Sequence, residues 1–150
     1  MKKIGIIIAV VLVVAVFAAV FVFATQNYRL LWSKVKDMRS IIKSYENIEL
    51  IETKSVYGKL NGNGNGIDFF GAALVTADSE ESVKALTALL DEKFWAAEYS
   101  IQTEKEIKTK YLVHEKLSFD YDFDESDDTY YLVFFFENDK RANLMDLKGH

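Results

Sequence analysis

The sequence predicts an α+β protein: an N-terminal transmembrane helix that continues into a second helix, followed by a small antiparallel-sheet domain. Two observations predict this class. Residues 4–24 form an apolar run without a charged residue. Beyond it, strand-like alternation of apolar and polar residues lies on both sides of one stretch with helical spacing. We expect an anchor over residues 1–26, a basic amphipathic helix over 27–46 and an acidic α+β domain over 47–150.

Residues 4–24 have the length and composition of a membrane span. A helix rises 1.5 Å per residue, so this run reaches about 31 Å, close to the hydrocarbon thickness of a bilayer. The run is apolar on every face, whereas a helix of a soluble protein keeps a polar face. Tyr28 and Trp32 follow where aromatic rings favour the membrane interface. The sequence therefore predicts a single-pass protein in contact with the lipid bilayer.

A cleaved signal peptide is the alternative to a retained signal-anchor. Lys2 and Lys3 form a basic start, and Val22-Phe23-Ala24 resembles a cleavage site. The apolar run is longer than the roughly 7–15 residues of a typical signal core, which favours retention. A basic start sends the following domain outward, although Arg29 and the lysines after it oppose this orientation. We expect a cell-membrane protein with an extracytoplasmic domain.

The charge is divided between the two parts of the chain. Residues 1–45 hold seven Lys or Arg and one acid, whereas residues 46–150 hold eleven bases and twenty-two acids. The basic part is attracted to anionic lipid headgroups, and the acidic part is repelled by nucleic acid. Nucleic acid is therefore excluded as a partner. The absence of cysteine and the presence of only two histidines argue against thiolate and histidine metal sites, and no cofactor is predicted.

Residues 27–46 carry one apolar stripe at helical spacing. The stripe consists of Leu31, Val35, Met38, Ile42 and Tyr45. Its positions match a heptad seam, so one interpretation is a coiled-coil stalk that pairs two copies into a homodimer. The stripe packing on its own domain, or lying on the lipid surface, is the other interpretation. Two heptads are too few to choose between them.

The domain begins with a predicted hairpin and a helix. Residues 48–60 and 67–76 are rich in strand formers, and the Asn-Gly repeats of 61–66 supply the turn between them. Asp78 or Ser79 is placed to cap a helix over about 79–97. Its apolar face comprises Val83, Leu86, Leu90, Phe94 and Ala97. We expect this helix to be the main cover of the core.

About three further strands follow the helix. From Ile101 to Phe123 the apolar residues fall on odd positions, with a break expected near residues 103–105 or near Glu115. Residues 129–137 are apolar on both faces, which predicts a central strand. We expect that strand to be joined to residues 116–124 through a polar turn.

The densest polar cluster lies in residues 120–128. It contains Asp120, Asp122, Asp124, Glu125, Asp127 and Asp128. The first three have the spacing of a calcium loop, but the glycine and glutamate that an EF-hand needs are replaced by Glu125 and Tyr131. The acids alternate with Phe119, Tyr121 and Phe123, as on a strand with one solvated face, which favours a solvated hairpin. We predict no metal-ligating residue here, and weak divalent-cation binding remains the alternative.

The other candidates for chemistry are weaker still. Gly62, Gly64 and Gly66 do not have the spacing of a phosphate loop, and His114 with Glu115 would point to opposite faces of a strand. The serines lack a nucleophile motif; they are Ser55, Ser118 and Ser126. No catalytic residue is predicted. We expect a membrane-tethered, non-enzymatic interaction or sensory module whose strands and Asn-Gly loop, residues 61–66, meet another protein at the membrane surface; the alternative is an envelope cation-binding protein or enzyme using residues 120–128.

Overall fold

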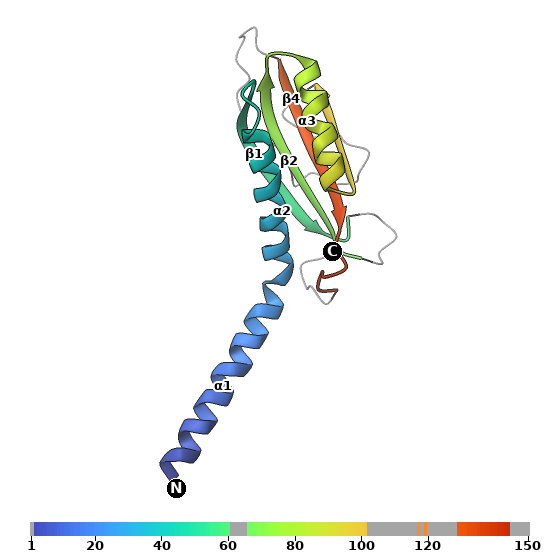
Figure 1. The fold of residues 1–150 in the computed structure, drawn as a ribbon. Coiled ribbons are helices and arrows are strands. Elements are labelled where there is room, and N and C mark those ends of the chain that lie inside the picture. Colours follow the sequence, from blue (N-terminus) through green and yellow to red (C-terminus); the bar gives the residue numbers. More distant parts are fainter. Residues whose placement is uncertain (1, 61–65, 102–116, 118, 120–128, 145–150) are drawn as a thin grey trace.

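The computed structural model describes residues 2–60, 66–101, 117, 119 and 129–144. In chain order it has α1 (Lys2–Ala24), α2 (Gln26–Lys43), β1 (Ile48–Gly58), β2 (Asp68–Ala77), α3 (Glu80–Lys93), β3 (Ala96–Ile101) and β4 (Tyr130–Asn138). The strands form one antiparallel sheet in the order β1-β2-β4-β3. Figure 1 shows α1 projecting away from the sheet, with α2 and α3 over one face. The predicted α+β class is confirmed.

The N-terminal helix is apolar and exposed, and the side-chain hydrogen bonds that tie it to later described residues are made at its last turn. Lys3–Ala24 is the one helix, among the described residues, that is long and apolar enough to cross a membrane, and none of it is buried. A signal sequence has the same properties. α1 is therefore compatible with a membrane anchor and with a signal peptide.

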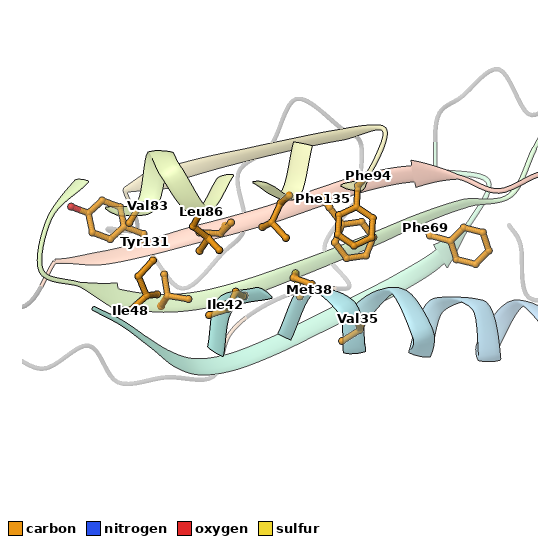
Figure 2. Close-up of a cluster of buried hydrophobic side chains, with 14 of the residues drawn as sticks. Val35, Met38, Ile42, Ile48, Phe69, Val83, Leu86, Phe94, Tyr131 and Phe135 are labelled. Atoms are coloured by element: carbon orange, nitrogen blue, oxygen red, sulfur yellow. The ribbon is translucent and has the colours of Figure 1, made fainter. Parts of the chain in front are cut away.

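The second helix packs on its own domain. Leu31, Val35, Met38 and Ile42 are all buried in the main core cluster, and Figure 2 shows the last three turned toward the sheet. Homodimer formation stays a prediction. Because the stripe is buried against the sheet, a dimer of this fold would have to form through residues outside the stripe. The helix ends at Lys43, so the predicted range 27–46 is too long by three residues at that end.

The strands β2 and β4 lie between two apolar layers, and their successive side chains point alternately into one layer and the other. Their odd-numbered residues join the helices in the first cluster: Phe69, Ala73, Val75, Tyr131, Val133 and Phe135. Their even-numbered residues form a second cluster on the other face: Phe70, Ala72, Leu74, Tyr130, Leu132, Phe134 and Phe136. Leu117 and Phe119 are buried in that second cluster. The prediction of a central strand buried on both faces is confirmed for β4.

The predicted hairpin of β1 and β2 is confirmed, and one glycine in it is required by packing. Gly71 lies opposite Phe135, and a Cβ added to Gly71 would stand 2.3 Å from a ring carbon of that phenylalanine. The ring cannot retreat easily, because it stacks on Phe94 with centroids 4.1 Å apart. Figure 2 shows these two rings superposed over the sheet.

The predicted helix over 79–97 is correct at its start and wrong at its end. Ser79 is the N-cap and accepts a hydrogen bond from the Ser82 backbone N–H at 3.3 Å. The helix stops at Lys93, and Ala96–Ile101 instead forms β3, paired with β4. Helical spacing at Phe94 and Ala97 is misleading because a short apolar run fits either structure. α3 also shares the cover of the core with α2 rather than supplying most of it.

The remaining strand predictions fall mostly outside the described residues. These are the alternation from residue 102 onward, its expected break, and the turn that joins 116–124 to β4. Within the described part, β4 pairs with β2 on one side and with β3 on the other.

Candidate functional site

Most residues considered for chemistry from the sequence lie outside the described part of the chain. They are Gly62, Gly64, His114, Glu115, Ser118, Asp120, Asp122, Asp124, Glu125, Ser126, Asp127 and Asp128. Ser55 is placed in β1 opposite Gly71, and Gly66 precedes β2. Among the described residues, no group of three or more His, Asp or Glu side chains is arranged to hold a metal ion.

The outward side of α2 carries an aromatic and cationic surface. We call it the α2 outer face; its members are Tyr28, Trp32, Lys36, Arg39 and Lys43. The helix places them there because its buried stripe, at the same three- and four-residue spacing, faces the sheet. Tyr28 is 62% and Trp32 59% exposed, unusual for large rings. A shallow hollow of about 350 Å³ is lined by residues 32–43 of this helix.

The cations of the α2 outer face have no acidic partner among the described residues. The Lys36 ammonium lies 5.5 Å from the centre of the Trp32 ring, and Arg39 donates to the Thr53 hydroxyl of β1 at 2.8 Å. Across residues 2–60, 66–101 and 129–144, no carboxylate forms an ion pair with Lys36, Arg39 or Lys43. The face is therefore a positive surface on a chain whose formal net charge is −5.

Another lysine of the same helix is buried in an ion cluster. Lys34 is 7% exposed; its Nζ lies 2.7 Å from Glu137 and 3.1 Å from Asp139, and 5.4 Å from the Phe69 ring centre. Arg141 also pairs with Asp139, at 2.7 Å. The hydrogen bonds from Arg141, and then those from Lys34, hold the pKa of the Asp139 carboxyl well below its ordinary value against the opposing effect of burial. This cluster fixes α2 to the end of β4.

The junction between α1 and α2 is held by residues from the far end of the sequence. Asn27 donates to the Asn143 carbonyl at 2.9 Å and accepts from the Asn143 backbone N–H at 2.7 Å. The Asn143 side chain donates to the Phe23 carbonyl at 3.2 Å, and the Gln26 side chain donates to the Arg141 carbonyl. The chain after β4 is thus attached to the last turn of α1.

The helix changes direction at this junction for an identifiable reason. Thr25 separates α1 from α2, and its hydroxyl donates to the Phe21 carbonyl at 2.8 Å. The carbonyls of Val22 and Phe23 accept side-chain donors, from Arg29 at 3.1 Å in the first case. Side chains inserted into the backbone ladder are a known cause of kinks. Figure 1 shows the resulting bend between α1 and α2.

A wider hollow of about 610 Å³ lies near the end of α2 farthest from α1. Its lining combines acidic, basic and apolar residues from the α2–β1 connection and the end of β2, including Lys43, Glu46 and Asp78. These charges are of both signs, and the hollow is open to solvent. It has the character of a surface depression between elements.

Sequence reasoning missed the ion cluster and the junction. The helical pattern assigns Lys34 to the polar side of the helix, although it stands directly before Val35 of the buried stripe. Its burial depends on Glu137 and Asp139, which are a hundred residues away in the sequence and give no local signal. The comparisons add no relative: no family model matches the sequence, and no curated protein or solved structure is significantly similar to it.

Proposed function

We propose that this chain is a single-pass membrane protein whose domain acts as a non-enzymatic interaction module at the membrane surface. The observation that carries the proposal is the continuity of the exposed apolar helix with a second helix that is built into the domain core. Residues 3–24 of α1 are exposed, whereas α2 is buried along one side and carries on the other side cations that form no ion pair with a carboxylate of the described residues. The lipid bilayer would cover α1, and a partner would cover the α2 outer face.

Retention of the anchor, rather than cleavage, is supported by the contacts at the junction. A signal peptidase would cut near Ala24, within a stretch whose carbonyls at Val22 and Phe23 accept hydrogen bonds from Arg29 and Asn143. Cleavage would remove the Val22 and Phe23 carbonyls, and with them the bonds from Arg29 and Asn143, while Gln26 and Asn27 would keep their bonds to the chain after β4. Because the basic N-terminal start favours translocation of the domain that comes after the span, we assign the domain to the extracytoplasmic side.

A protein partner is supported by the length of the α2 outer face. From Tyr28 to Lys43 the helix rises about 22 Å, whereas the headgroup layer on one side of a bilayer is about 5–8 Å thick. An upright α2 therefore holds Lys36, Arg39 and Lys43 beyond the lipid. Carboxylate-bearing side chains of another membrane protein would pair with these cations, and an apolar side chain would pack on Trp32.

Site-specific photo-crosslinking in the native membrane tests this function. A crosslinking residue at Ser40, which is exposed between Arg39 and Lys43, should give a discrete adduct with a partner protein. The same residue at Ala85, exposed on α3, is the control. Lys36→Glu with Lys43→Glu should abolish the Ser40 adduct while the protein stays in the membrane fraction. Equal labelling from the two positions, or none, would contradict the proposal.

A further inference from the structure

One arginine of α2 reaches back toward α1. The Cα of Arg29 lies five residues beyond the end of α1, yet its guanidinium donates to the carbonyl of Val22 at 3.1 Å. The charge therefore stands within about 3 Å of the level of Ala24, measured along the helix. Long basic side chains adopt this posture where an apolar segment gives way to a polar layer. One of the five guanidinium N–H donors is used by Val22, and the side chain is otherwise exposed.

A second exposed cation, Lys140, is carried to the same junction by the chain after β4. Asp139 and Ala142 close a turn through a 2.8 Å backbone hydrogen bond, and Lys140 and Arg141 are its central residues. The hydrogen bonds from Gln26 and Asn143 hold this turn against the last turn of α1. Lys140 is exposed, and the Arg141 side chain is 73% exposed. Arg141 uses its Nε and one Nη on Asp139, which leaves outward N–H donors.

We propose that Arg29 and Lys140 bind the phosphate groups of anionic phospholipids where α1 leaves the bilayer. The inference rests on the membrane insertion of α1 in the proposed function, and it assigns a second ligand to a different surface. Asp139 and Glu137 are already engaged by Lys34 and Arg141, so the carboxylates near the turn are shared by the ion cluster. Arg29 and Lys140 then contribute two positive charges with no carboxylate partner within the described chain.

Two features favour a lipid over a protein as the ligand of these cations: their position close to the end of the apolar helix, and the exposed apolar side chains beside them. The Arg29 guanidinium reaches the last turn of α1, within the thickness of a headgroup layer, and the backbone on either side of Lys140 is held near that turn through the Arg141 carbonyl and the Asn143 side chain. Tyr28 and Leu144 at the same level are 62% and 66% exposed, and both side chains suit the boundary between headgroups and acyl chains. The cations of the α2 outer face beyond Trp32 stand too far along the helix to reach the phosphates. The two surfaces thus have different ligands.

Lipid selectivity of the full-length chain in detergent and in nanodiscs tests this inference. Native mass spectrometry would compare the binding of phosphatidylglycerol with that of phosphatidylcholine to the chain. Each juxtamembrane cation contributes a factor of about 5 to the affinity for an anionic surface, so Arg29→Gln with Lys140→Gln should lower the preference about 30-fold. Arg29→Lys keeps the charge and should retain most of the preference. Lys36→Gln with Lys43→Gln removes the same charge higher on α2 and should leave it unchanged.

The outcomes separate this inference from the proposed function. Alkaline carbonate extraction first establishes whether the chain is held by the bilayer; release would overturn both proposals. A chain that is retained, but that binds the two lipids equally, overturns the lipid site alone. An equal loss of preference in the Lys36 and Lys43 control would also overturn it, because the effect would then depend on net charge rather than on position.

Discussion

The substitution Lys34→Met tests whether the buried ion cluster fixes α2 to β4. Methionine keeps the unbranched apolar part of the side chain, but it removes the ammonium that lies over the Phe69 ring and pairs with Glu137 and Asp139, whose side chains are 21% and 7% exposed. Removing one partner of a buried pair destabilises a protein by about 3–5 kcal/mol. We expect about 3 kcal/mol, the lower limit, because Arg141 still pairs with Asp139 and Glu137 is partly hydrated.

The assay is equilibrium urea unfolding of the full-length protein in detergent micelles, followed by tryptophan fluorescence. Lys84→Met is the matched control, since its ammonium also pairs with two carboxylates, those of Glu80 and Glu81, but is 48% exposed. Surface ion pairs contribute little to stability, so the control should unfold close to the wild type. Because both lysines pair with two carboxylates, a difference in the loss of unfolding free energy between the two variants reflects the burial of Lys34 and not the number of ion pairs.

A dependence on pH gives the same prediction a second signature. Asp139 has a lowered pKa in the folded chain, so its pairing stabilises the protein above the ordinary carboxyl pKa, near 3.9, and this contribution is lost as the pH falls below that value. In Lys34→Met, the part of this stabilisation that comes from Lys34 is missing at every pH. The difference in unfolding free energy between the wild type and this variant should therefore narrow below about pH 4. A loss no larger than that of Lys84→Met, or one that is constant with pH, would refute the reasoning.

Three further substitutions probe other parts of the molecule. Gly71→Ala should destabilise the protein by about 1–3 kcal/mol in the same assay, since its Cβ meets an aromatic ring, whereas Gly5→Ala, with open space around it, should not. Asn27→Ala removes two part-buried hydrogen bonds to the Asn143 backbone, so we expect a loss of about 1–3 kcal/mol and faster hydrogen exchange at the Asn143 amide; unchanged exchange would contradict the junction contacts. Asp139→Asn should flatten the fall in stability below about pH 4, and an unchanged acid profile would remove the role assigned to this carboxyl.

The elements that sequence reasoning located correctly are those whose pattern is local and repeated. The stripe from Leu31 to Ile42 has the same spacing over three turns, and the residues 130–136 are apolar at every position. Such patterns specify which side is buried without reference to the partner surface. The cap at Ser79 was found for the same reason, because it satisfies donors of its own first turn.

The features that were missed depend on distant residues. The run Phe94 to Ala97 is apolar enough for a helix or a strand, and pairing with β4 decides the outcome: Ala96 lies opposite Phe136. The Asp91 carboxylate stabilises the reversal by accepting from the Ala97 backbone N–H at 2.9 Å. A central strand apolar on both faces needs a neighbour on each side, and β3 supplies the second one from residues 96–101, the first two of which the sequence assigns to the helix. The position of β3 depends on its pairing with β4, a contact between residues distant in sequence that the local pattern does not reveal.

The attachment of α1 to the domain is stronger than a tether requires. A chain that merely held a domain near a membrane would need only a linker, yet here Asn27 and Asn143, 116 residues apart in sequence, exchange two hydrogen bonds beside the end of α1. The ion cluster of Lys34 lies two turns farther along the same helix and joins the same segment. With two such connections, α2 cannot rotate about its axis without breaking buried polar contacts. In the proposed function, a partner bound to the α2 outer face would therefore act on the orientation of α1 in the bilayer, and a change in α1 would act on the partner surface.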